Sequence, residues 1–240
     1  MLFLFFYVYF LFLWYNGVIV GGFMLVFKKY FSLFIIYSFI GWLMEVLWTL
    51  VTDRKLVNRG FLIGPYCPIY GVGCLLLIVF LDRFKNNLVL LFFMSIIICS
   101  ILEYSTSYIM EKMFKARWWD YSEYKFNLNG RICAATMIPF GILGVLVVYF
   151  LNPFISGIVN FNNVLFIFIL VLFFTDFGVS YGIIENMKGT ITSVAKDSTE
   201  EITKRVRELL FNKSIFHKRL IKAFPSFRSP IDRLRSIVRR

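Results

Sequence analysis

Hydrophobic residues fall along this chain in long runs that short polar segments separate. About 20 consecutive apolar residues are needed for a helix to cross the hydrocarbon core of a bilayer. Five of the runs match that length closely enough to predict membrane spans. The pattern therefore predicts an all-α fold, a polytopic transmembrane helix bundle with core spans at about Tyr30–Val51, Phe61–Leu81, Leu88–Met110, Ile132–Leu151 and Val164–Ile184.

A sixth apolar run occupies residues 1–27, which contain no charged side chain. The run is long enough to span, and it lacks the basic start and the small-residue cleavage site of a secretory signal. Two interpretations stay open: the run is an extra span, or translation begins at Met24. We divide the remaining chain into a transmembrane bundle, residues 28–187, and a basic tail, residues 188–240.

The stretch from Asn58 to Cys74 interrupts the apolar pattern, because four glycines and two prolines fall within its 17 residues. Non-helical backbone at membrane depth persists only where protein buries it or where it lines a wet cavity. Such breaks often mark transport sites. The stretch predicts a broken or re-entrant helix start, and the alternative is a tight loop before an ordinary helix.

Composition supports a membrane protein. Hydrophobic residues make up 59% of the 240 residues and charged residues 17%. A soluble domain holds roughly 45–50% apolar and about 25% charged residues, so the excess apolar surface has to face lipid. The four cysteines form no C-x-x-C pair and the only histidine, His217, lies far from them. We therefore expect free thiols, no metal site and no cofactor.

Basic residues are concentrated in the tail, which carries +9 of the net charge of +12. A cytoplasmic tail beside anionic lipid explains this charge without any nucleic acid. Two tail segments, one around Ile202, Val206 and Leu209 and one starting at Ser229-Pro230, predict amphipathic helices that lie on the membrane or on a partner. The polar loops after the first and third spans are also rich in Lys and Arg, so the positive-inside rule places both loops and the tail in the cytoplasm.

Three acidic residues, Glu45, Glu103 and Asp176, lie inside predicted spans. A charged side chain at the bilayer centre costs about 2.5–3.5 kcal/mol on insertion scales, so each should face the bundle interior. The acids form either a proton- or cation-linked polar cavity or structural ion pairs with Arg59, Arg117 or Arg131. The position of Glu45 near its helix end favours a structural role for that residue.

Other features of the spans and loops suggest further roles. Aromatic residues in the loop after the third span (Trp118, Trp119, Tyr121 and Tyr124) predict a segment held at the membrane surface. Gly178 and Gly182 form a G-x-x-x-G pattern that permits helix association, either between copies of the chain or within one copy.

The sequence carries no complete catalytic motif. It contains no H-E-x-x-H and no Walker A loop, and a single histidine in the tail cannot supply the base of a triad. The protein is therefore not expected to be an enzyme, and any ATP-driven activity would need a separate subunit. A carboxylate pair such as Glu103 with Asp176 could perform acid–base chemistry only if the two residues met.

Three sequence segments resemble a known family: N-R-G-F-L-I-G-P-Y-C-P-I-Y-G-V-G, E-Y-S-T-S-Y-I-M-E-K-M-F-K-A-R-W-W-D-Y-S and F-N-L-N-G-R-I-C. They are similar to bacterial membrane proteins described as ABC-transporter permeases of a type IV or CmpB kind, over about Phe27–Phe150. The residues that match are Glu45, Asn58, Arg59, Gly60, Gly64, Pro65, Pro68, Tyr70, Gly71, Glu103, Thr106, Ser107, Glu111, Trp118, Trp119, Asp120, Tyr121, Asn127, Asn129, Gly130 and Arg131.

The resemblance implies a multi-pass permease of the bacterial inner membrane that pairs with a separate ATPase subunit. It assigns no catalytic or binding role to single residues. We take as functional candidates the polar and aromatic residues Glu45, Asn58, Arg59, Glu103, Glu111, Trp118, Trp119, Asp120, Asn127, Asn129, Arg131 and Asp176.

Three functions are consistent with these features. In the first, the chain is a permease subunit whose substrate path lies between the spans that bear the three acids. In the second, it is a non-transporting membrane scaffold or regulator that acts through its cytoplasmic loop and basic tail. In the third, it is a lipid-modifying enzyme that uses Asp120 or the loop Asn127–Arg131 near lipid headgroups.

Overall fold

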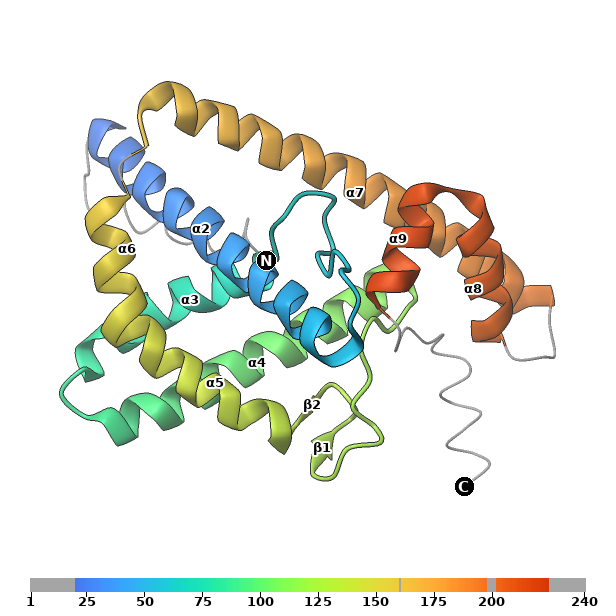
Figure 1. Cartoon of the computed structure of the whole chain (residues 1–240), viewed down its shortest axis with the longest axis horizontal. Helices are drawn as coiled ribbons and strands as arrows, with labels where there is room; N and C mark the ends of the chain where they lie inside the picture. The colour runs from blue at the N-terminus through green and yellow to red at the C-terminus, as the bar shows by residue number, and fades with distance from the viewer. Residues whose placement is uncertain (1–19, 160, 198–201, 225–240) are drawn as a thin grey trace.

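The computed structural model describes residues 20–159, 161–197 and 202–224, which are mostly helical (Figure 1). Most of the N-terminal apolar run and the basic helix expected from Ser229-Pro230 lie outside these residues. The helices are α2 (Val20–Asp53), α3 (Pro68–Leu81), α4 (Leu88–Phe114), α5 (Ala134–Leu146), α6 (Asn152–Ile158), α7 (Asn163–Asp197), α8 (Ile202–Lys213) and α9 (Ile215–Ala223).

Short elements complete the fold. A 3-10 turn, η1 (Asp82–Phe84), follows α3, and a π-helical turn, η2 (Val147–Leu151), joins α5 to α6. Strands β1 (Asn127–Leu128) and β2 (Ile132–Cys133) pair antiparallel, with Asn127 opposite Cys133. Asn129 and Gly130 have positive φ at the tip of this hairpin, the conformation that asparagine and glycine adopt most readily.

Four helical segments among the described residues are long and apolar enough to cross a membrane: Gly22–Asp53, Leu88–Phe114, Ala134–Ile158 and Asn163–Ile191. The expectation of five such core spans is therefore not met in full. The second expected span, Phe61–Leu81, is helical only from Pro68 onward. At 1.5 Å per residue, the 14 residues of α3 extend about 21 Å, which is less than the roughly 30 Å of the hydrocarbon core.

The break that the Gly/Pro stretch predicts lies directly before α3. Residues 55–67 form no helix, and α3 begins at Pro68, where a missing backbone N–H costs nothing. Gly60, Leu62 and Cys67 are buried, whereas Lys55, Leu56 and Pro65 are exposed, so protein encloses part of this irregular backbone. We name residues 55–67 the Gly/Pro loop.

Small residues let α2, α3, α4 and α5 approach one another closely. A Cβ atom on Gly41 of α2 would lie 2.2 Å from the ring of Tyr70, and one on Gly71 of α3 would lie 2.3 Å from Ser38 Oγ. A Cβ on Gly144 of α5 would lie 2.1 Å from Ser95 Oγ of α4. Ser38 and Gly41 of α2, Gly71 of α3, Ser95 of α4 and Gly144 of α5 therefore lie on the packing faces of their helices.

The fourth span is longer than the sequence predicts. The lack of charge from Asn152 to Asn163, together with Pro153 and Gly157, predicts a turn, but α6 continues as helix to Ile158 and the connection is only residues 159–162. Pro153 does not stop the helix, because it lies in the first turn of α6, directly after the wider turn η2.

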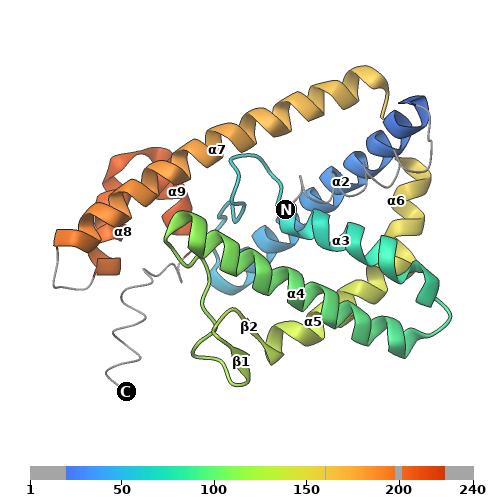
Figure 2. The same ribbon diagram turned by 180° about the vertical axis from the view of Figure 1, so that it is seen from behind.

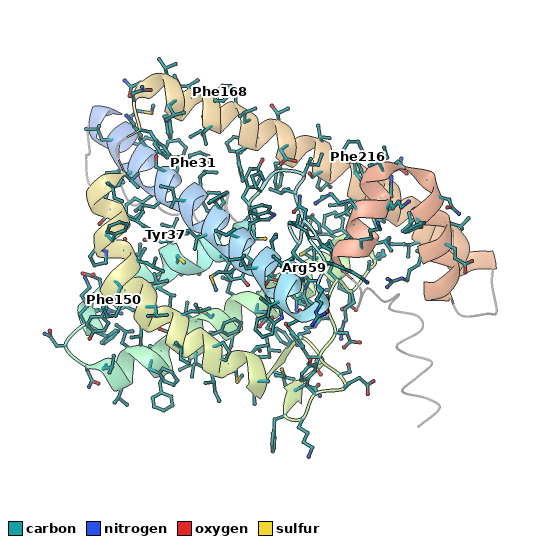
Figure 3. All side chains as sticks on the ribbon, viewed as in Figure 1. Phe31, Tyr37, Arg59, Phe150, Phe168 and Phe216 are labelled. Atoms are coloured by element: carbon teal, nitrogen blue, oxygen red, sulfur yellow. The ribbon has the colours of Figure 1, made fainter. Side chains whose placement is uncertain are left out.

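Helix α7 contacts the bundle mainly through aromatic side chains. Phe166 and Phe173 of α7 meet Phe31 and Phe34 of α2, with ring centroids 5.4–5.8 Å apart. Figure 3 shows Phe168 on the outer side of α7. Gly178 and Gly182 are exposed, and a Cβ atom added to either would have no atom within 4 Å, so they do not serve packing among the described residues.

The tail does not separate from the bundle at residue 188, because α7 continues as one helix to Asp197. Helices α8 and α9 then fold back onto the bundle. The tail cluster, as we name it, joins them to α4 and α7 through Phe114, Ala116, Trp118, Ile184, Met187, Ile191, Val206, Leu210, Leu220 and Ile221. Val206 of the predicted apolar edge thus lies in the protein's own core, which corrects the expectation that it faces the membrane or a partner, whereas Leu209 of the same edge is 47% exposed.

The Gly/Pro loop, the β1–β2 hairpin and helices α8 and α9 lie at one end of the bundle, and the α3–α4 connection and α6 lie at the other (Figures 1 and 2). The Lys- and Arg-rich segments therefore share one end, as the positive-inside pattern requires. We name it the basic end of the molecule.

Candidate functional site

Asp176 connects α7 to the Gly/Pro loop. Its carboxylate accepts hydrogen bonds from the backbone N–H groups of Ile63 (3.0 Å) and Gly64 (2.7 Å) and from the hydroxyl groups of Tyr66 and Ser180. The loop has no helix or strand to satisfy these backbone donors. A carboxylate with four donors is well stabilised as an anion, so Asp176 replaces the missing secondary structure.

Asn58 organises the start of the same loop. Its side-chain oxygen accepts from the Trp42 indole of α2 (2.8 Å) and from the Gly60 backbone (2.9 Å), while its amide donates to the Ile63 carbonyl (3.0 Å). Both polar atoms of the side chain are therefore used, within the loop and toward α2. Asn58 therefore has a structural role, which is to hold the non-helical backbone of the Gly/Pro loop in place.

Two arginines fasten α9 to the Gly/Pro loop. Arg219 donates to the carbonyls of Gly60 (2.9 Å) and Phe61 (3.3 Å), and Arg59 donates to the carbonyl of Ala223 at the end of α9 (2.5 Å). Figure 3 shows Arg59 between α2 and this end of α9. Burial lowers the pKa of Arg219, and the nearby negative charge of Asp176 opposes that shift.

Glu45 is held by one base and one tyrosine. Arg59 Nε lies 3.5 Å from Glu45 Oε2, and the Tyr70 hydroxyl of α3 donates to Glu45 Oε1 (2.6 Å). This ion pair is the structural arrangement that the position of Glu45 favours. Burial and the charge of Glu45 raise the pKa of the adjacent Cys67 thiol to about 12, so this thiol is unreactive at neutral pH.

Glu103 has a different environment. It is 8% exposed, and the Tyr121 hydroxyl donates to its Oε1 at 3.1 Å. Neither Arg117 nor Arg131 pairs with it, because both bind Glu111 instead. Glu103 also does not share a hydrogen-bond partner with Asp176 among the described residues, so the structure gives no support to a catalytic pair formed by these two acids.

Glu111 forms the centre of an ion-pair network at the end of α4. Arg117 Nη2 and Arg131 Nη2 each lie 2.9 Å from Glu111 Oε2, and Arg117 Nη1 donates to the carbonyl of Asn129 (2.9 Å). Arg131 also stacks its guanidinium over the rings of Tyr104 and Tyr108. Removing one member of such a network would leave a buried charge unpaired, which makes the network a structural lock for residues 115–131.

The remaining candidates of this loop also shape its backbone. Asp120 Oδ1 accepts from the backbone and hydroxyl of Ser122 (3.1 and 2.5 Å) and lies 3.5 Å from Arg117 Nη1. Asn127 holds the hairpin turn through Gly130 N–H (2.9 Å) and the Tyr124 carbonyl (2.8 Å). Asp120 and Asn127 are thus committed to the loop itself.

The two tryptophans differ from each other. Trp118 is only 3% exposed and stacks edge-on against Phe61 of the Gly/Pro loop and Phe224 after α9. It is a core residue, so the expectation that it anchors the loop at the membrane surface is wrong. Trp119 is half-buried and donates to the Arg131 carbonyl (3.3 Å).

Several residues of the site are absent from the sequence-based candidates. Tyr66, Tyr70 and Tyr121 each donate to one of the intramembrane acids. All three lie in the family-like segments, and Tyr70 and Tyr121 are also among the matching residues, which was the available signal. Arg219 gave no signal, because it is one of 14 basic residues in the tail.

The described residues contain no group of three or more His, Cys, Asp or Glu side chains that could hold a metal ion. All four cysteines are free. The polar groups therefore form four sets: Asp176 with the Gly/Pro loop, Glu45 with Arg59 and Tyr70, Glu103 with Tyr121, and the Glu111 network.

Long apolar helices with acids turned inward define a polytopic integral membrane protein. The family model described as "Putative ABC-transporter type IV" matches residues 32–181, which is more than half of the chain. The chain belongs to this family. Neither the curated proteins nor the solved structures contain a match.

Proposed function

We propose that this protein is the membrane-embedded permease subunit of an ABC-type transporter in the bacterial inner membrane. The family match carries the proposal, since it covers all three intramembrane acids, the Gly/Pro loop and the Glu111 network. The sequence has no Walker A loop, so the proposal requires a separate ATPase subunit. The basic end, including the tail, faces the cytoplasm.

In this proposal, the substrate path runs beside Glu45, Glu103 and Asp176, and the Gly/Pro loop is its gate. The support is that side chains, not regular backbone bonds, hold this loop. A segment held in this way can change its partners without unfolding a helix. The substrate itself is not defined by these residues.

The test is affinity purification of the tagged full-length protein from native membranes in mild detergent, followed by mass spectrometry. The proposal expects a nucleotide-binding ATPase subunit in stoichiometric yield. A homo-oligomer without any ATPase would contradict it.

Matched variants make this test more specific. Phe126 at the basic end is 87% exposed, and Phe154 of α6 at the opposite end is 71% exposed. If the ATPase docks on the basic end, Phe126→Ala should reduce its recovery several-fold and Phe154→Ala should not. Equal recovery with both variants would exclude the hairpin tip as the docking surface.

The α8–α9 region favours a second candidate function, a non-transporting scaffold or regulator. Ile215 is 84% exposed and Phe216 is also exposed, and both lie near Lys213 and Lys218. An apolar and basic surface of this kind suits an anionic lipid surface or a protein partner. Deleting residues 197–240 would test the tail but would also remove Val206, Leu210 and Leu220 from the core.

Exposed residues allow a cleaner comparison. The double variant Ile215→Ser and Phe216→Ser leaves the tail cluster intact, so the fold should persist. A scaffold that binds through this surface would lose its co-purifying partners, whereas a permease would retain its ATPase. A third function, a lipid-modifying enzyme, has no such observation in its favour, because Asp120 is committed to Ser122.

A further inference from the structure

The Glu103 carboxyl group is buried with only one of its two oxygens satisfied. Oε1 accepts from Tyr121, whereas Oε2 is enclosed and accepts no hydrogen bond from the described residues. An ionised carboxylate carries charge on both oxygens and needs donors for both. Burying such a charge without partners costs far more free energy than burying a neutral acid with one unpaired hydroxyl, which costs about 1–3 kcal/mol.

The charged groups around Glu103 also disfavour a negative charge there. On its own helix it has the neutral Cys99, from the loop it has Tyr121, and from α2 the nearby charge is that of Glu45. The local bases are used elsewhere, because Arg59 pairs with Glu45 and Arg117 and Arg131 pair with Glu111. Within the described residues, no ion pair joins a base to Glu103.

Tyr121 links the two acids electrostatically. Burial raises the pKa of Tyr121, and the hydrogen bond to Glu103 and the charge of Glu45 raise it further. The hydroxyl therefore remains a neutral donor. Because both acids raise the pKa of Tyr121, Glu45 and Glu103 both lie close enough to its phenol group to interact with it electrostatically.

Asp176 provides the opposite case within the same chain. It has four donors, including two backbone N–H groups. It needs no proton to be stable in the bundle. The two acids are therefore distinguished by their partners, although both lie inside membrane spans.

We infer that Glu103 is a proton-binding site, whose carboxyl group carries a proton on Oε2 at neutral pH opposite the ionised Glu45. The inference rests on the proposed permease function and deepens it. It names the proton as the ion whose binding is linked to movement of the substrate along the proposed substrate path.

Infrared spectroscopy of the full-length protein in lipid tests this inference directly. A protonated carboxyl group has a carbonyl band above the amide bands, and ¹³C-glutamate labelling separates glutamate from aspartate. We expect one glutamate carboxyl band at pH 7 that Glu103→Gln removes and Asp176→Asn leaves unchanged. The absence of this band, or a band that persists in Glu103→Gln, would overturn the inference.

A second arm distinguishes a proton from a metal cation. Spectra are recorded in sodium chloride and in choline chloride at the same pH. The proton site predicts the same band in both salts, whereas a bound sodium ion would keep Glu103 ionised and remove the band in sodium chloride only. That outcome would overturn the proton assignment.

The stability of Glu103→Gln serves as a control for the infrared experiment, because it shows whether the variant keeps the fold. Glutamine resembles a protonated glutamate in shape and charge and keeps an acceptor for Tyr121. We expect Glu103→Gln to unfold within about 0.5 kcal/mol of the wild-type protein, as substitutions that remove no named interaction do. The infrared result does not depend on the ATPase, so failure of this inference and failure of the permease proposal are distinguishable.

Discussion

Asp176 and Glu103 show how partners decide the role of an acid inside a membrane span. The sequence places both residues within apolar runs and predicts that they turn inward, which the structure confirms. It cannot predict their donors, because those come from segments distant in the chain: Tyr121 for Glu103 and the Gly/Pro loop for Asp176. Hydrogen bonds across 113 residues leave no local pattern in the sequence.

Removing the charge of Asp176 should loosen the Gly/Pro loop. In Asp176→Asn, one carboxylate oxygen becomes an NH₂ donor that faces other donors, so at least one buried N–H loses its acceptor. We expect a loss of about 1–3 kcal/mol in unfolding free energy, visible as a lower thermal midpoint of tryptophan fluorescence in detergent.

Ser180→Ala is the matched control, because it removes one hydroxyl and leaves the carboxylate in place. Its cost should be about 0.5–1.5 kcal/mol. Equal stability of Asp176→Asn and the wild-type protein would show that the carboxylate does not hold the loop.

His217 should make the docking of α9 sensitive to pH. Burial lowers the pKa of His217 from its usual 6.5, the charge of Lys213 lowers it further, and the carbonyl of Ile183 opposes both. The undocked imidazole therefore binds a proton at a higher pH than the docked one. Docking is fully stable above about pH 6.5 and weakens as the pH falls toward the lowered pKa.

Spin labels on Lys222 and Phe126, which are both exposed, can report this change. We expect one narrow distance distribution at pH 7.5 and a broader one at pH 5.5. The same labels in His217→Gln should show no change between the two pH values. A pH response that persists in His217→Gln would assign the effect to another group.

Among the elements, α3 and the Gly/Pro loop were partly predictable. Glycine and proline density indicated a break before α3. Helix length was harder to predict, because hydrophobicity continues from Phe61 into α3 although the backbone becomes helical only at Pro68. The helix around Val206 was predicted, but the surface that buries Val206 was not, because an apolar edge indicates burial without indicating the surface that provides it.

Close packing of α2 against α3 leaves no room for a larger side chain at Gly71. A methyl group on Gly71 would meet Ser38 Oγ at 2.3 Å and the Phe34 backbone oxygen at 2.6 Å. Because backbone cannot move aside cheaply, Gly71→Ala should destabilise the protein by about 1–3 kcal/mol. Thermal unfolding in detergent measures the effect.

Gly178→Ala is the control, since no atom lies within 4 Å of its added methyl group. Its stability should stay within about 0.5 kcal/mol of wild type. If instead Gly178→Ala changed the oligomeric state in detergent, the exposed G-x-x-x-G face would be a contact between copies of the chain.

The whole molecule has two distinct ends, and the distribution of Lys and Arg anticipated this division. The Gly/Pro loop, the hairpin and α8–α9 share the basic end, although they are separated by up to 164 residues along the chain. The sequence could not show that the Gly/Pro loop contacts α9, since their links are single side chains such as Arg59 and Arg219.

The side of the membrane on which the basic end lies can be measured with thiol labelling. Phe126→Cys lies at the basic end and Gly157→Cys at the opposite end, and both positions are exposed. In intact cells, an impermeant maleimide should label Gly157→Cys and leave Phe126→Cys unlabelled until the cells are opened. The reverse pattern would place the tail outside the cytoplasm.

The dependence of the Gly/Pro loop on Asp176 also sets an order of events during synthesis. Ile63 and Gly64 are made more than 100 residues before their acceptor. At a synthesis rate of about 5–20 residues per second, roughly 6–23 seconds pass before Asp176 leaves the ribosome. Until then, water, headgroups or the insertion machinery must satisfy these backbone donors. The first half of the chain can therefore enter the bilayer early, but α3 reaches its final depth only after α7 has been inserted.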